Sequence, residues 1–254
     1  MPRGSRAVSL LMLGLILSVG PAAAQRSETV HLGSGGGGTD AFVAYPVSKS
    51  AAGVIVAHDQ WGLNDQARSV ARRLSSEGYV AIVPDLDHRG AVVDEADQAH
   101  GVSQFNVPTE RANADLDAAL AWLRANPRVG NRPIGVMGFG MGGAIALGYG
   151  LHSSAVSGIV VFDGLPVTDA AQLEALHTPV LAHFGLKDQT IPEARVAAFR
   201  QGMAEAGHNA EVYAYPTAGH GFMNDARPSY QPDAARQAWA RTLAFLQKQL
   251  RDSK

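Results

Sequence analysis

The chain of 254 residues contains no cysteine. This absence excludes disulfide bonds, thiolate metal sites and a cysteine nucleophile. Charge is also sparse, because charged residues make up 17% of the chain and the formal net charge is −2. The sequence has neither a basic stripe nor an acidic tail, so we expect no nucleic-acid partner.

The apolar run at the N-terminus is too short to favour a membrane span. Arg3 and Arg6 precede this run, which extends from Ala7 to Val19, and Pro21-Ala22-Ala23-Ala24 supplies the small residues of a cleavage site. We predict a signal peptide over residues 1–24, cut after Ala24, with an uncleaved anchor as the alternative. The mature chain is then expected to be periplasmic or secreted, free of the membrane and monomeric.

Apolar runs and helical patterns alternate along the remaining chain. Two short β-like runs, Thr29–Leu32 and Ala41–Tyr45, predict an N-terminal hairpin. Further strands are predicted at Gly53–Ala57, Val80–Val83, from Ile134, and at Gly158–Phe162, Pro179–Gly185 and Ala210–Tyr215. Helices are predicted at about Asn64–Glu77, Thr109–Ala125, Pro192–Ala206 and Pro232–Leu250. This cadence indicates an α/β fold in one domain over residues 25–254, with a mostly parallel sheet and helices on both faces.

The segment Gly138-Phe139-Gly140-Met141-Gly142 is crowded with glycine and predicts a strand, a sharp turn and a helix. It matches the nucleophile elbow of α/β-hydrolases, G-x-nucleophile-x-G. The middle residue is Gly140, which accepts a positive φ without steric cost but has no atom that could attack a carbonyl. The sequence therefore predicts an elbow whose nucleophile position is vacant.

An acidic residue and then a histidine follow this elbow along the chain, which is the order found in α/β-hydrolases. Asp188 and His220 each come just after a predicted strand, at the sheet edge where parallel sheets bind ligands. Asp188 could instead cap the next helix, and His220 could be a surface residue. We favour a hydrogen-bonded pair of the two.

Other polar residues at the same edge have plainer interpretations. We interpret Asp163 as structural, and His58 and His183 as hydrogen-bonded core histidines. Because no metal-ligand spacing such as H-x-x-x-H is present, we expect no metal and no cofactor. The long polar stretch from about Asp87 to Pro108 is a candidate wall or cap over the site.

Taken together, these motifs resemble the dienelactone hydrolase family over essentially the whole chain after the signal peptide. The matching segments are Val54–Asn64, Pro84–Leu86, Gly138–Gly143, Gly185–Asp188 and Ala218–Phe222. The resemblance implies an α/β-hydrolase fold and the hydrolysis of a small ester or lactone.

The resemblance also implies roles for individual residues. His220 matches the catalytic histidine of the family and Asp188 its orienting acid. Asp59 matches a glutamate that contacts the nucleophile, and it is one methylene shorter. Asp59 could instead only accept hydrogen bonds from neighbouring backbone N–H groups. The backbone N–H groups of Met141 and Gln60 match the oxyanion hole, which does not depend on side-chain identity.

The substrate-binding residues match the family less completely. Arg89 matches one of two arginines that bind a substrate carboxylate, and we expect Arg89 and Trp61 to contact the substrate. The second arginine falls near Asn224. A two-arginine clamp on a dicarboxylate-like lactone is therefore not expected.

Without a nucleophile, three functions stay open. In the first, His220 activates a water held in the space of the missing side chain, and an ester or lactone is hydrolysed. In the second, the same histidine serves another proton transfer, such as isomerisation of a lactone. In the third, the chain is a non-catalytic protein that binds a small molecule. We favour hydrolysis, because a pure binding scaffold needs neither Asp188 nor His220.

Overall fold

The computed structural model describes residues 26–33, 38–88 and 107–251. The predicted signal peptide, Arg89 and most of the predicted 87–108 loop lie outside the described residues. Among the described residues, no helix combines the length and the apolar character needed to cross a membrane.

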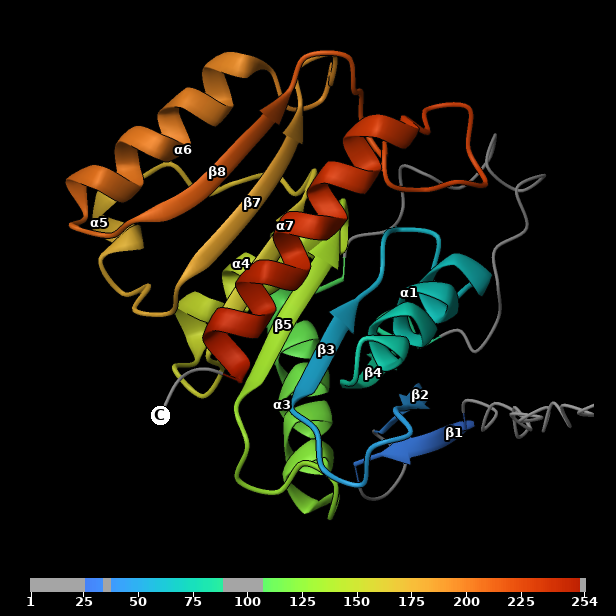
Figure 1. Cartoon of the computed structure of the whole chain (residues 1–254). Helices are drawn as coiled ribbons and strands as arrows, with labels where there is room; N and C mark the ends of the chain where they lie inside the picture. The colour runs from blue at the N-terminus through green and yellow to red at the C-terminus, as the bar shows by residue number, and fades with distance from the viewer. Residues whose placement is uncertain (1–25, 34–37, 89–106, 252–254) are drawn as a thin grey trace, which may run out of the picture.

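One eight-stranded sheet forms the centre of the described structure (Figure 1). Its strands are β1 (Arg26–Leu32), β2 (Thr39–Tyr45), β3 (Gly53–Ala57), β4 (Val80–Pro84), β5 (Ile134–Phe139), β6 (Gly158–Phe162), β7 (Val180–Gly185) and β8 (Ala210–Tyr215). They lie in the order β1-β2-β4-β3-β5-β6-β7-β8. β2 is antiparallel to β1 and β4, and every other neighbouring pair is parallel.

Helices cover both faces of this sheet. They are α1 (Asp65–Ser76), α3 (Thr109–Ala125), α4 (Met141–His152), α5 (Ala170–Leu173), α6 (Glu193–Glu205) and α7 (Pro232–Leu250). α1 and α7 pack on one face, where α7 crosses in front of the central strands in Figure 1, and α3 and α4 pack on the other. The predicted α/β architecture is confirmed, and α5 is the one described helix that the sequence analysis did not predict.

Alternation along the central strands divides the core into two apolar layers. In β3, Val54 and Val56 join the layer under α1 and α7, whereas Ile55 and Ala57 join the layer under α3 and α4. Successive side chains of a strand point to opposite faces, so a strand covered on both faces reads as a continuous apolar run.

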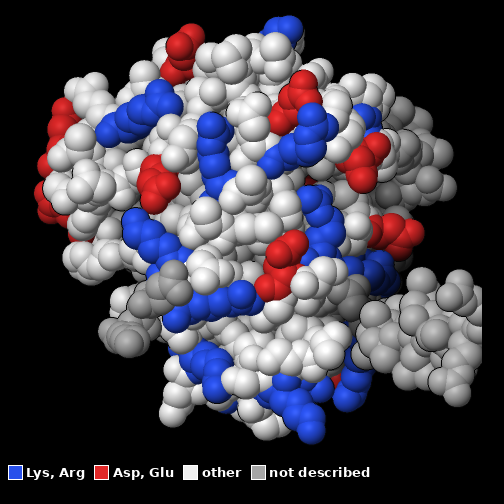
Figure 2. Space-filling view, in the orientation of Figure 1, with Lys and Arg blue, Asp and Glu red and all other residues white. Residues whose placement is uncertain are grey.

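Arginines on the face that carries α1 and α7 pack on aromatic rings. The guanidinium carbon of Arg73 lies 4.0 Å from the ring centre of Trp239, and that of Arg251 lies 4.2 Å from the ring centre of Tyr79. Figure 2 shows this face, with acidic side chains among the basic ones. Cation–π contacts at exposed sites contribute about 0.5–1 kcal/mol each. The first contact joins α1 to α7, and the second joins the end of α7 to the residue before β4.

The turn from β5 into α4 brings two backbones into close contact. A Cβ atom on Gly142 would lie 2.2 Å from the carbonyl oxygen of Ala57 and 2.3 Å from that of His58. Only a residue without a side chain fits there, because both obstacles are main-chain atoms that cannot rotate away. The first turn of α4 is thereby held against the end of β3.

This contact predicts a strong and local effect of substitution. Gly142→Ala should lower the free energy of unfolding by about 2–3 kcal/mol, because overpacking against backbone forces a main-chain shift. Gly148→Ala in the same helix is the matched control, since a Cβ atom there meets nothing within 4 Å. The control should be neutral or stabilising by up to about 1 kcal/mol. Urea unfolding of both variants measures the difference, and equal effects would contradict the packing described.

Candidate active site

The carboxyl ends of parallel strands deliver the candidate residues to one edge of the sheet. Asp59 follows β3, Gly140 follows β5, Asp163 follows β6, Asp188 follows β7 and His220 follows β8. Ligands bind at this edge in open α/β sheets. The predicted site residues that lie within the described chain are therefore brought together.

Asp188 and His220 form a short hydrogen bond. Nδ1 of His220 lies 2.7 Å from Oδ2 of Asp188. The other oxygen of Asp188 accepts hydrogen bonds from the N–H groups of Thr190 at 2.7 Å and Ile191 at 3.0 Å. These amides precede α6, so Asp188 holds its own turn and does not cap that helix. With Nδ1 donating to the carboxylate, Nε2 of His220 is left as the basic nitrogen.

The pair shifts the ionisation of both residues. The hydrogen bond that His220 donates to Asp188 raises the pKa of His220, and burial opposes this rise. Burial by itself would raise the pKa of Asp188, but the hydrogen bond from His220 and the two backbone N–H groups outweigh it and lower the pKa. The ion pair is therefore favoured over the neutral pair.

The elbow keeps a positive φ at its central residue although its nucleophile is absent. Gly140 has φ 52° and ψ −117°, and its N–H donates to the carbonyl of Phe162 at 2.8 Å. A Cβ atom on Gly140 would lie 2.4 Å from Oδ1 of Asp59 and 3.1 Å from Oδ2. The Asp59 carboxylate therefore lies where the side chain of a residue at position 140 would begin, which is the space in which the sequence analysis expects a water molecule.

The same carboxylate lies on the expected oxyanion hole. Oδ1 of Asp59 accepts a hydrogen bond from the Gln60 N–H at 2.7 Å and a longer one from the Met141 N–H at 3.4 Å. Met141 begins α4, and the amino end of a helix favours negative charge. A negative side chain of the protein itself therefore sits where an oxyanion of a substrate would be bound.

Asp163 connects the two loops that carry the pair. Its Oδ2 accepts from the Gly221 N–H at 3.0 Å, beside His220, and its Oδ1 accepts from the Gly185 N–H at 3.3 Å, at the end of β7. Asp163 is buried and has φ 47°, a left-handed conformation that is uncommon outside glycine. The structural interpretation of Asp163 holds, and its position beside His220 is a feature that the sequence analysis missed.

Two cavities adjoin the elbow, and a larger hollow lies away from it. A small one of about 20 Å³, enough for one water molecule, is lined in part by Asp59, Gly140, Asp163 and Asn224. A cavity of about 240 Å³ between α3 and α4 is lined in part by Met141 and other largely apolar residues. A hollow of about 550 Å³ lies at the opposite, amino ends of the strands and contains none of the candidate residues.

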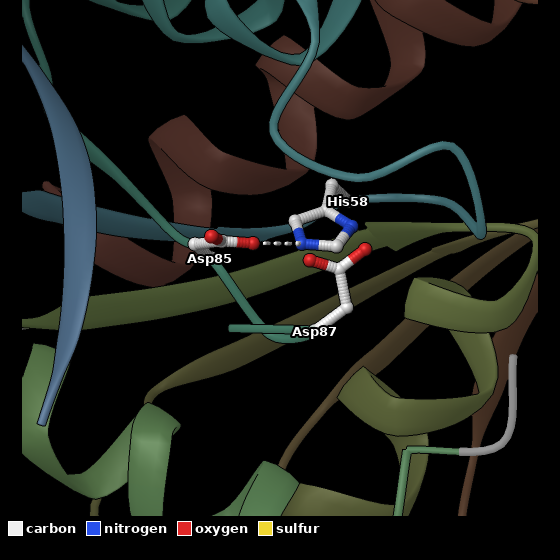
Figure 3. A group of neighbouring side chains, drawn as sticks. All are labelled: His58, Asp85 and Asp87. Carbon is white, nitrogen blue, oxygen red and sulfur yellow. Dashed lines mark ion pairs between the residues drawn. The ribbon is translucent and has the colours of Figure 1, made fainter. Parts of the chain in front are cut away.

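One described cluster has the composition of a metal site. His58, Asp85 and Asp87 converge within 4.8 Å (Figure 3). However, Nδ1 of His58 donates to the Asp59 carbonyl at 2.7 Å, and its Nε2 accepts from the Leu86 N–H at 3.0 Å. A cation would have to compete with the Leu86 N–H for the one lone pair of the ring. The geometry thus fits a hydrogen-bonded core histidine, as predicted, and His58 anchors the backbone of Asp59.

His183 is likewise a core histidine. Its ring nitrogens lie 3.0 Å from the Tyr215 hydroxyl and 3.2 Å from the Thr242 hydroxyl. Burial, assisted by the positive charge of Arg241, lowers the pKa of His183 to about 3. The ring is therefore neutral and structural.

The expected substrate-binding residues are placed only in part. Arg89 lies outside the described residues. Trp61 is 8% exposed, and the guanidinium carbon of Arg227 lies 3.9 Å from the centre of its ring. Arg227 comes three residues after Asn224, and the sequence analysis did not consider it. It brings a positive charge to the same loop.

The raised pKa of Asp163 predicts that the free energy of unfolding depends on pH. Burial raises its pKa from 3.8 to about 7 in the folded chain. The native state therefore keeps a proton that the unfolded state loses above about pH 4. This stabilisation is complete below pH 3.8 and is lost as the pH rises toward 7, at up to about 1.4 kcal/mol per pH unit.

The measurement compares wild-type protein with Asp163→Asn, which cannot ionise. The wild-type advantage in free energy of unfolding should fall between pH 4 and 7 and stay level above that range. Asp225→Asn, at an exposed position, is the control and should show no such slope. If the difference in free energy of unfolding between wild type and Asp163→Asn does not change between pH 4 and 7, the carboxyl of Asp163 is ionised over that whole range.

Comparison with known proteins agrees with this architecture. The family model described as "Dienelactone hydrolase family" matches residues 39–250. A candidate carboxymethylenebutenolidase of Escherichia coli (strain K12) is 34% identical over 210 residues, which cover 77% of this chain and 76% of the relative. A candidate 2-oxo-3-(5-oxofuran-2-ylidene)propanoate lactonase of Bradyrhizobium is 30% identical over 86% of this chain and 93% of its own.

Solved structures give the same result. A candidate dienelactone hydrolase of Klebsiella pneumoniae superposes with a TM-score of 0.78 at 30% identity, covering 87% of this chain and 98% of that one. The residues that the family model matches, 39–250, include the elbow and the loops that carry Asp188 and His220. The chain belongs to the dienelactone hydrolase family, a family of α/β-hydrolases.

Proposed function

We propose that this protein hydrolyses a small ester or lactone with a water molecule that the Asp188–His220 pair activates. The observation that supports this most directly is the 2.7 Å hydrogen bond between His220 Nδ1 and Asp188 Oδ2, because it fixes the tautomer that leaves Nε2 as a base. The names of the carboxymethylenebutenolidase and lactonase relatives support a lactone as the substrate.

The reaction requires Asp59 to leave the oxyanion hole. Once its side chain rotates away, the N–H groups of Gln60 and Met141 can receive the substrate carbonyl oxygen. His220 takes a proton from water, and the resulting hydroxide attacks the acyl carbon. The tetrahedral intermediate then breaks its acyl C–O bond, and the departing alkoxide takes the proton back from His220.

Two observations favour a second candidate function. Gly140 has no nucleophile, and the Asp59 carboxylate blocks the N–H of Gln60 at 2.7 Å. A non-catalytic protein that binds a small molecule could keep this arrangement unchanged. Binding of a small lactone without turnover, detected by calorimetry, would support that candidate.

Removal of the base tests the hydrolytic proposal. His220→Ala should lower the rate of p-nitrophenyl acetate hydrolysis by about 10²- to 10⁴-fold, the usual contribution of general-base catalysis. His177→Ala, an exposed histidine on another loop, is the control and should leave the rate unchanged. Absence of hydrolysis by the wild-type protein, or equal rates in wild type and His220→Ala, would exclude the proposed mechanism.

The pH dependence provides a second test of the same pair. Only neutral His220 is a base, so the rate should rise with pH. Its midpoint should lie above 6.5, the ordinary value for histidine, because Asp188 raises the pKa of His220. Asp188→Asn should move the midpoint to lower pH as well as slow the reaction. An unmoved midpoint would mean that another group controls the rate.

Because Asp59 crowds the elbow, we expect a nucleophile introduced at residue 140 to react only if Asp59 is also replaced. Gly140→Ser by itself places its side chain against the Asp59 carboxylate and should gain little. Asp59→Ala with Gly140→Ser should form an acyl-enzyme that is visible by mass, and Asp59→Ala alone should accelerate ester hydrolysis by freeing the oxyanion hole. A free hole contributes at most about 10²- to 10³-fold.

Asp59→Ala with Gly140→Ala is the matched control for the two substitutions, because it adds the Cβ atom without a hydroxyl. It should form no acyl-enzyme. If Gly140→Ser alone matches the double variant with serine, the carboxylate does not obstruct the elbow.

A further inference from the structure

A reactive oxygen is present at the elbow, although Gly140 does not supply it. Oδ1, Cγ and Oδ2 of Asp59 would lie 2.4, 2.9 and 3.1 Å from a Cβ atom on Gly140. The loop after β3 therefore places a whole carboxylate where a nucleophilic side chain of the elbow would begin. Asp59 is half-buried, so this group is held in place and still reachable.

We propose that the Asp59 carboxylate is itself a nucleophile, and that it attacks a saturated carbon bearing a leaving group, as in a small primary alkyl halide. Carboxylates serve as nucleophiles in covalent catalysis. This activity goes beyond the proposed ester hydrolysis, and it uses Asp59 in the position that the structure shows.

The hydrogen bonds of Asp59 favour a saturated carbon over an acyl carbon. Attack on an ester would create an oxyanion on the substrate, but the N–H groups of Gln60 and Met141 already bind Oδ1. Attack on a saturated carbon creates no oxyanion. Oδ2 forms a bond to that carbon, the carbon–halogen bond breaks, and the halide leaves with the electron pair. An alkyl ester of Asp59 results.

The second step uses the oxyanion hole as it stands. Oδ1 is now the carbonyl oxygen of the aspartyl ester, and it already lies on the N–H groups of Gln60, at 2.7 Å, and Met141, at 3.4 Å. His220 Nε2 takes a proton from water, whose oxygen attacks Cγ of Asp59, and the negative charge develops on Oδ1. Preorganised donors at that atom stabilise this intermediate.

Collapse of the intermediate restores the enzyme. The bond between Cγ and Oδ2 breaks, and the alkoxide, which carries the original Oδ2, takes the proton from His220 to leave as an alcohol. Asp59 keeps Oδ1 and the oxygen from water, and it releases a proton to solvent. The sum of both steps is alkyl halide and water to alcohol and hydrogen halide.

The test uses bromoethane and the full chain. His220→Gln should block the second step, so one ethyl group should accumulate on the peptide that contains Asp59, as seen by mass spectrometry. Asp59→Asn with His220→Gln should show no such adduct, because asparagine keeps an acceptor for the two amides but has no nucleophilic carboxylate. Asp225→Asn with His220→Gln is the control at an exposed carboxylate and should keep the adduct.

A single turnover of wild-type protein in ¹⁸O-labelled water gives an independent readout. The label should enter Asp59, and the first ethanol released should be unlabelled. The proposal is overturned if folded His220→Gln carries no ethyl group on Asp59, or if the label appears only in ethanol.

The outcomes also separate this proposal from the hydrolytic one. Ester hydrolysis that depends on His220, without an Asp59 adduct, would overturn the alkyl-halide activity alone. An Asp59 adduct in a chain that does not hydrolyse p-nitrophenyl acetate would overturn the ester activity alone. Asp59→Ala should further distinguish them, since it should abolish bromide release and accelerate ester hydrolysis.

Discussion

The hydrogen bond from the Gln60 N–H to the Asp59 carboxylate controls what this site can do. It holds Oδ1 of Asp59 over the elbow at 2.7 Å from the amide nitrogen, where the carboxylate and a side chain on residue 140 cannot both fit. The position of the Asp59 side chain therefore depends on the absence of a side chain at residue 140. Residue 140 must lack a side chain to leave space for the Asp59 carboxylate, and glycine also adopts the positive φ of the elbow. The carboxylate of Asp59, from the loop after β3, occupies the nucleophile position.

Two residues with a positive φ lie at the same edge of the sheet. Gly140 and Asp163 follow the neighbouring strands β5 and β6, and both have a positive φ. A positive φ costs conformational free energy at Asp163, because this residue has a side chain. The two hydrogen bonds that its carboxyl accepts from Gly185 and Gly221 offset that cost. Strain of this kind persists only where surrounding contacts over-determine it, and it is common at functional sites. The loops of Asp188 and His220 are fixed relative to each other as a result.

The two proposed reactions differ in the position of the Asp59 side chain. With Asp59 turned away, the oxyanion hole is open to a substrate carbonyl and the pair of Asp188 and His220 can act on water. With Asp59 in place, the amides serve its own carboxylate, and the reacting group belongs to the protein. Both proposed reactions use His220 as the base, so neither needs a nucleophile on residue 140.

Much of the fold could be predicted from the sequence, because the signals are local. Continuous apolar runs such as Gly53–Ala57 identify buried parallel strands, and glycine spacing identifies the elbow. The order of Gly140, Asp188 and His220 placed the pair at one edge of the sheet. These features depend on side-chain type and on spacing along a single segment.

The sequence by itself determined the architecture, the vacant elbow and the residues of the candidate pair. Only the tertiary structure decided that Asp59 fills the vacancy, that Asp163 joins two loops and that Arg227 stacks on Trp61. Each of these contacts joins loops that are distant along the chain, and each depends on fractions of an ångström in how the strands are aligned. No local pattern encodes such distances, because packing of the whole sheet sets them.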